Sequence, residues 1–121
     1  MDIPLVGQLI VSLEFGFSLA LRTNHDYELR IESTFRLDEP GSDGFRGVPD
    51  ESLSDNTAVR RLEGRQVVRA YASDDGDLRI EFADRASLVV PFDPDFEAWT
   101  VAAPQGFKAV SVAGGGLTVW D

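Results

Sequence analysis

Few residues in this 121-residue chain have the types and spacing that catalysis requires. His25 is the only histidine, and it lies between Asn24 and Asp26 in a segment typical of turns. No Gly-x-Ser-x-Gly sequence is present to supply a nucleophilic serine for it. The chain has no cysteine, which excludes thiol nucleophiles, disulfides and thiolate-bound metals. We therefore expect a protein that is not an enzyme and has no catalytic residue.

Three short segments have residues that bind ions in other proteins. Asp74, Asp75 and Asp77 resemble part of a calcium loop, but no glutamate closes it at the spacing of an EF-hand. Residues 93–97 hold a second acidic cluster. The triple glycine 114–116 leads into an apolar segment without lysine, whereas phosphate-binding loops lead into a helix. We interpret these segments as solvated turns and a hairpin turn, and predict no metal site and no cofactor.

The charge balance favours one class of partner. The chain carries 21 acidic and 11 basic residues, a net charge of −10, which repels nucleic acids and anionic membranes and suits a basic protein. Arg60, Arg61, Arg65 and Arg69 form the one local concentration of cations, and we expect it to balance the acidic residues 37–56. The candidate contacts for a basic partner lie in that acidic stretch and in the aspartate-rich turn: Asp38, Glu39, Asp43, Asp50, Glu51, Asp74, Asp75 and Asp77.

Aromatic residues gather in the last thirty positions. Two-residue alternation would place Glu97 and Trp99 on the same face of a strand at Phe96–Val101. If Trp99 points inward, Glu97 lies near the core and needs a partner. Large aromatic side chains pack in the hydrophobic core more often than they bind a ligand, so we expect both Trp99 and Trp120 to be buried. Glu97, Trp99 and Trp120 form the candidate pocket if a ligand binds instead.

The elements that would position these residues are short strands. Apolar residues alternate with polar ones in eight or nine segments separated by turn residues. The clearest are 8–14, 17–22, 27–31, 66–72, 78–82, 87–92, 96–101, 107–112 and 117–120. We predict one all-β domain over residues 1–121, mainly antiparallel, folded as a small sandwich or a closed barrel.

One helix and one long loop interrupt the strand pattern. Leu53, Val59 and Leu62 have helical spacing, Ser54 or Asp55 can cap the N-terminus, and Gly64 suits the end. This predicts a short helix near 54–63. Glycine, proline and acidic residues dominate residues 37–56, which predicts a long irregular connection.

The two halves of the chain repeat one pattern. Residues 7–35 and 64–92 each begin with Gly, carry Val four residues later and end in Phe after the same number of positions. A two-residue shift within the second segment aligns Leu19 with Leu78 and Leu29 with Leu88. We predict two equivalent three-strand meanders.

The C-terminal part carries a family resemblance. The strand Phe96-Glu97-Ala98-Trp99 is followed by Gly114-Gly115-Gly116-Leu117-Thr118-Val119-Trp120. With the earlier Gly64-x3-Val68 and Leu78-x-Ile80-x-Phe82 patterns, this resembles a small actinobacterial family of uncharacterised proteins. The resemblance spans residues 7–120 and implies no activity and no site residue.

Two function hypotheses follow from these observations. The first is a non-enzymatic, acidic protein-interaction module of the bacterial cytoplasm, for example an immunity-type inhibitor of a basic bacterial protein. The alternative is a small-molecule-binding β-barrel or β-sandwich protein. Its ligand would bind at the open end of the barrel or sandwich, lined by the aromatic residues of the C-terminal part. The N-terminus lacks the pattern of a signal peptide and no apolar run is long enough to span a bilayer, so we expect a cytoplasmic protein.

Overall fold

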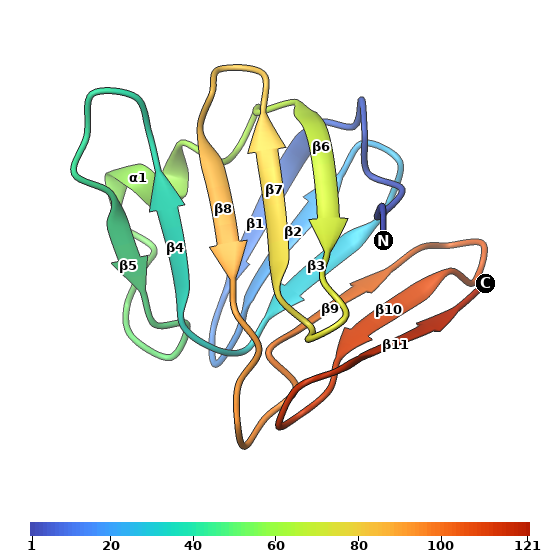
Figure 1. The fold of residues 1–121 in the computed structure, drawn as a ribbon. Helices are drawn as coiled ribbons and strands as arrows, with labels where there is room; N and C mark the ends of the chain where they lie inside the picture. Colours follow the sequence, from blue (N-terminus) through green and yellow to red (C-terminus); the bar gives the residue numbers. More distant parts are fainter.

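Two antiparallel sheets make up the structure, a computed structural model that describes residues 1–121 (Figure 1). The six-stranded sheet has the order β1-β2-β3-β9-β10-β11, and the five-stranded sheet has the order β5-β4-β8-β7-β6. The strands are β1 (Ile10–Phe15), β2 (Leu19–Thr23), β3 (Glu28–Ile31), β4 (Phe35–Asp38), β5 (Phe45–Gly47), β6 (Val67–Ala72), β7 (Leu78–Phe82), β8 (Ser87–Val90), β9 (Trp99–Ala102), β10 (Lys108–Ser111) and β11 (Leu117–Trp120). The prediction of an all-β fold is confirmed, and the sheets do not form a closed barrel.

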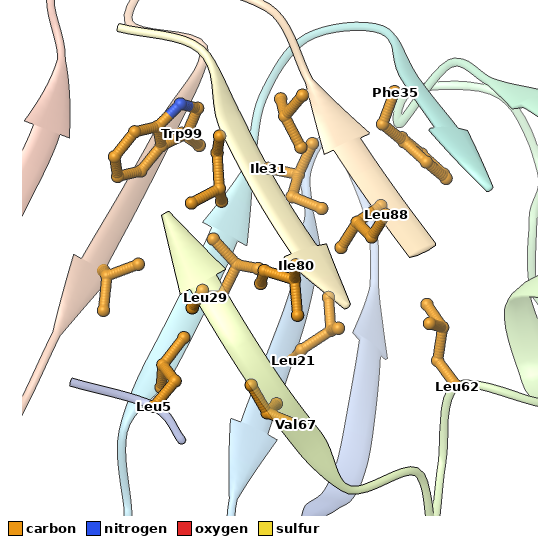
Figure 2. Packing of buried hydrophobic residues seen from close by; sticks show 14 of the residues in the cluster. Leu5, Leu21, Leu29, Ile31, Phe35, Leu62, Val67, Ile80, Leu88 and Trp99 are labelled. Carbon is orange, nitrogen blue, oxygen red and sulfur yellow. The ribbon is translucent and has the colours of Figure 1, made fainter. Parts of the chain in front are cut away.

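The hydrophobic core lies between the sheets. Leu21, Leu29 and Ile31 point inward from the six-stranded sheet and meet Ile80 and Leu88 from the five-stranded sheet (Figure 2). Their neighbours along each strand are more exposed, as two-residue alternation requires. Burial of this apolar surface is the main force that holds the sheets together.

The two meanders, β1-β2-β3 and β6-β7-β8, have matching registers. Leu19 pairs with Ile31 across β2 and β3, and Leu78 pairs with Val90 across β7 and β8. The next inward pair is Leu21 with Leu29 in the first meander and Ile80 with Leu88 in the second. Leu19 and Leu78 therefore occupy corresponding positions, and so do Leu29 and Leu88.

Irregular features of the meanders also correspond. A bulge at Val11 interrupts the pairing of β1 with β2, and a bulge at Val68 interrupts that of β6 with β7. The only two non-glycine residues with positive φ are Asp26 (63°) and Arg85 (71°), which occupy the same place in the β2–β3 and β7–β8 turns. The correspondence therefore extends to the turns.

Reciprocal hydrogen bonds join the two meanders at their first strands. The amide of Gly7 donates to the carbonyl of Val67, and the amide of Gly64 donates to the carbonyl of Ile10, both over 2.7 Å. Leu9 and Gln66, which occupy corresponding positions, form a bridge between them. The meanders are thus related by an approximate twofold relationship centred on this bridge.

After each meander the chain crosses to the other sheet. β4 follows β3 but pairs with β8, where Leu37 lies opposite Leu88. β9 follows β8 but pairs with β3, where Val101 lies opposite Leu29. Each sheet is therefore completed by strands from the other half of the chain, which explains how one core can include both halves.

Three sequence predictions are wrong in detail. Residues 37–56 are not one long irregular connection, because β5 and part of β4 lie within them. The predicted strand at Phe96–Val101 begins only at Trp99. The helix, α1 (Thr57–Arg60), is shorter than predicted, and its N-cap is Asn56, whose side chain accepts a hydrogen bond from the amide of Val59 (3.0 Å).

No helix of the structure could cross a lipid bilayer.

Candidate functional site

The most exposed aromatic side chains lie at one end of the sandwich. Phe17, in the turn between β1 and β2, is 94% exposed, and Phe96, in the segment between β8 and β9, is 64% exposed. Both line a surface hollow of about 370 Å³, together with Val48 and Pro49. Both connections lie at the lower end of the molecule in Figure 1. We call this area the Phe17–Phe96 surface.

Acidic residues border the Phe17–Phe96 surface. Glu32, Asp50 and Asp93 line the same hollow, and no cation does. Two aromatic rings and three carboxylates therefore line one hollow, which combines apolar area with negative charge. Such a surface is complementary to a cationic group with an apolar neighbour.

Asp93 shapes this surface through three hydrogen bonds. Its Oδ2 accepts from the hydroxyl of Ser33 (2.6 Å), and its Oδ1 accepts from the amides of Asp95 (2.8 Å) and Phe96 (3.2 Å). These bonds, that from Ser33 first, lower the pKa of Asp93 below its usual value. The carboxylate therefore stays charged at neutral pH while it fixes the backbone that carries Phe96.

Two more hollows adjoin the turn that carries Phe17. One, of about 300 Å³, is lined by Glu14, Arg30 and Phe17, and the other, of about 310 Å³, by Asp50 and Glu51. Both also include parts of Phe15 and Gly16. The β1–β2 turn therefore contributes residues to three neighbouring hollows.

The corresponding turn of the second meander is covered instead. The carbonyl of Gly76 accepts hydrogen bonds from the indole of Trp99 and from the hydroxyl of Ser111, both over 2.8 Å. The amide of Gly116 donates to the carbonyl of Asp75 (2.8 Å). The six-stranded sheet ends in β11, whereas the five-stranded sheet has no strand beyond β5. The β10–β11 hairpin therefore covers the β6–β7 turn. The five-stranded sheet has no counterpart of β11 to cover the β1–β2 turn, and Phe17 remains exposed.

The predicted acidic contacts do not form one surface. Asp50 borders the Phe17–Phe96 surface, and Glu51 lies in an adjoining hollow. Asp43 is exposed in the β4–β5 connection, beside Asp38, which pairs with Arg36 (3.0 Å).

The aspartates of the β6–β7 turn are separate from that surface. Asp74 and Asp75 are exposed, and the side chain of Asp77 accepts a hydrogen bond from the amide of Phe92 (2.8 Å). Asp77 is therefore part of the turn structure.

Glu39 pairs with two of the arginines that we expect from the sequence to balance residues 37–56. Its carboxylate accepts hydrogen bonds from Arg61 (2.7 and 2.8 Å) and Arg65 (2.6 Å), and its side chain is only 13% exposed. The bonds from Arg61 and then Arg65 lower the pKa of Glu39 to about 2. Arg65 also pairs with Asp84 (2.9 Å). Glu39 is therefore held within this ion network.

The three residues of the predicted pocket, Glu97, Trp99 and Trp120, differ in burial. Trp99 is fully buried in the core, whereas Trp120 is 51% exposed on the edge strand β11. The expectation that both indoles are buried is therefore wrong for Trp120. Glu97 is exposed, because it precedes β9 and the strand alternation does not reach it.

Sequence reasoning missed Phe17 as a surface residue. Its alternation with Leu19 and Leu21 suggested a buried strand position, but β2 begins only at Leu19. The adjacent Gly16 was the local signal that the turn continues through Phe17.

No group of three or more histidine, aspartate or glutamate side chains is arranged to hold a metal ion. His25 is exposed in the β2–β3 turn, where its backbone amide donates a hydrogen bond to the hydroxyl of Thr23 (3.3 Å).

Comparisons with known proteins give a family but no function. Searches among curated proteins and among solved structures found no match to the chain. The model of a family of unknown function, DUF6188, matches residues 1–121. The chain therefore belongs to the DUF6188 family, a family of unknown function.

Proposed function

We propose that this protein is a non-enzymatic interaction module that binds a basic protein through the Phe17–Phe96 surface. The observation that supports this most is Phe17, an aromatic side chain left 94% exposed at the tip of a turn. Exposing a phenyl ring to water is unfavourable, and aromatic side chains are common anchors of protein interfaces.

The charge around the aromatic rings favours a basic partner. Glu32, Asp50 and Asp93 border the rings, and the net charge of the whole chain is −10. Opposite charge on the partner would steer the encounter, and the rings would be buried as the interface closes. An immunity-type inhibitor of a basic bacterial protein, acting in the cytoplasm, is one form of such a module.

The shape of the surface favours a protein over a small molecule. The hollows beside Phe17 are open, and Trp99, a member of the predicted aromatic pocket, is buried in the core. A small ligand usually needs a site that covers most of its surface. An open surface with projecting rings suits the side chains of another protein.

The test is a quantitative pull-down from lysate of the native host with the wild type and two variants. Phe17→Ser combined with Phe96→Ser removes both rings. Trp120→Ser is the matched control, since it removes an exposed aromatic residue from β11. A basic protein retained by the wild type and by Trp120→Ser but lost with the double variant supports the proposal.

Charge variants test the acidic border separately. Glu32→Gln with Asp50→Asn should slow association of the captured protein about tenfold at low salt, with little change at high salt. Asp74→Asn with Asp75→Asn changes the same charge at the other predicted contact segment and should have a smaller effect. A captured protein that is acidic, or that binds all variants equally, would contradict the proposal.

A further inference from the structure

The outer face of the five-stranded sheet is basic, in contrast to the whole chain. Five of the 11 basic residues are exposed on this face or in its β7–β8 turn: Arg36, Arg46, Arg69, Arg79 and Arg85. The strand pairing places Arg79 beside Tyr71 and Val89, and Arg36 beside Val89 and Arg46, in one row across the sheet. These residues are distant in sequence, so the cluster is created only by the strand order.

Three of these arginines surround one hollow. Arg69, Arg79 and Arg85 line a recess of about 580 Å³ between β6, β7 and the β7–β8 turn. Its apolar lining includes Val68, which the bulge in β6 turns outward. The hollow is open to solvent, so its cationic lining, rather than its volume, distinguishes it from the hollow beside Phe17 and Phe96.

The guanidinium groups in this hollow keep most of their donors free. Glu81 is the one acidic residue of the lining, and its oxygens lie 3.9 Å from Arg69 and 4.0 Å from Arg79, beyond hydrogen-bond distance. The side chain of Arg85 makes no ion pair or hydrogen bond within the chain. The hollow therefore has a positive excess and unused N–H donors.

Arg85 also occupies an unfavourable backbone position. Its φ of 71° lies in the left-handed region, where glycine, asparagine and aspartate are preferred. The corresponding residue of the first meander is Asp26, a residue that suits this position. Arginine is not among the residues preferred at this φ, and this position makes the Arg85 side chain a candidate for a function beyond folding.

The first meander lacks this cationic group. The positions that correspond to Arg69, Arg79 and Arg85 are Ser12, Ala20 and Asp26. Both meanders have the same bulge and the same registers, so the backbone alone does not require arginine at these sites. The three arginines are specific to one half of the sandwich.

We propose that this hollow binds a small polyanion through Arg69, Arg79 and Arg85. The planar guanidinium fork pairs with two oxygens of a phosphate or carboxylate group at once, and the hollow presents three such forks. Tyr71, in register with Arg79, lies beside the hollow with the guanidinium of Arg69 5.6 Å from its ring centre. This site shares no residue with the Phe17–Phe96 surface, so it goes beyond the interaction function proposed above.

The experiment is isothermal titration calorimetry at low ionic strength with two probes, pyrophosphate and citrate. Saturable binding of either probe at about millimolar concentration or below supports the site, and the tighter probe distinguishes phosphate from carboxylate ligands. Arg79→Gln and Arg85→Gly should each weaken binding about tenfold or more.

Arg85→Gly makes the test specific. Because glycine relieves the positive φ, this variant should melt at the same temperature as the wild type or higher while it loses the anion. Arg46→Gln is the matched control, since it removes one charge from the same sheet face outside the hollow. Absence of saturable binding, or equal weakening by Arg46→Gln and Arg85→Gly, would overturn the proposal.

Discussion

The indole nitrogen of Trp99 donates a hydrogen bond to the carbonyl oxygen of Gly76 over 2.8 Å. Trp99 begins β9 in the six-stranded sheet, and Gly76 lies in the β6–β7 turn of the five-stranded sheet. The hydroxyl of Ser111 donates to the same oxygen, also over 2.8 Å. One carbonyl group therefore joins the two sheets at this end of the core.

Substitutions at the two tryptophans should have very different effects on stability. Trp99→Ala should lower the free energy of unfolding by about 3–5 kcal/mol, because it removes a fully buried indole and its hydrogen bond. Trp120→Ala should lower the free energy of unfolding by about 1 kcal/mol or less. The ring of Trp120 is half exposed, and the ammonium group of Lys108 lies 5.7 Å from the ring centre. Urea unfolding followed by circular dichroism measures both, and equal losses would contradict the assignment of Trp99 alone to the core.

Gly47→Ala should destabilise the protein by about 1–3 kcal/mol, because a methyl group there would overlap the ring of Phe35 on the paired strand. Gly16→Ala is the control, since a methyl group at Gly16 meets no atom within 4 Å and its φ is not positive. That variant should be as stable as the wild type or slightly more so. Thermal melts compare the two variants. Adding Phe35→Leu to Gly47→Ala replaces the ring with a smaller side chain, so the double variant should recover part of the lost stability.

Glu39 should make stability depend on pH in the acid range. Its pKa is about 2 in the folded protein, below the ordinary value of 4.5, so its ion pairs stabilise the fold above about pH 4.5. As the pH falls from 4.5 toward 2 the unfolded chain binds the proton first, and this contribution, on the order of 1–3 kcal/mol, is lost.

The variant Glu39→Gln isolates this effect. It should be less stable than the wild type at pH 7, and the difference should shrink toward zero near pH 2. Melting temperatures of both proteins across this range measure it. Because the pKa values of Asp84 and Asp93 are also lowered, both proteins should still lose stability in acid, and only the difference between them reports on Glu39.

Phe17→Ser should leave the free energy of unfolding within about 0.5 kcal/mol of the wild type, because the ring is almost fully in water. Phe35→Ala, at a buried phenylalanine, should cost about 3–5 kcal/mol. Chemical denaturation gives both values. Should Phe17→Ser prove strongly destabilising, the ring would be part of the fold and its loss could not be used to test partner binding.

The sequence by itself determined the features that depend on neighbouring residues. Alternation of apolar and polar residues identified most strands, since successive side chains in a strand point to opposite faces. Turn residues such as Asn24 and Asp26 marked the ends of strands, and matched spacing aligned Leu19 with Leu78. These properties are local, so they can be read along the chain.

The tertiary structure decided which strands pair and which side chains remain uncovered. The short strand β4 was missed because it is completed by pairing with β8, whose residues lie about fifty positions further along the chain, and β5 was missed because it is a three-residue edge strand that pairs with β4 alone. The same long-range pairing gathers Arg69, Arg79 and Arg36 on one face and holds Glu39 beside Arg61 and Arg65. Phe17 and Trp99 are both aromatic residues in strand-like patterns, yet one is exposed and the other buried. Burial depends on what packs against a side chain, and that is set by contacts between distant segments rather than by local sequence.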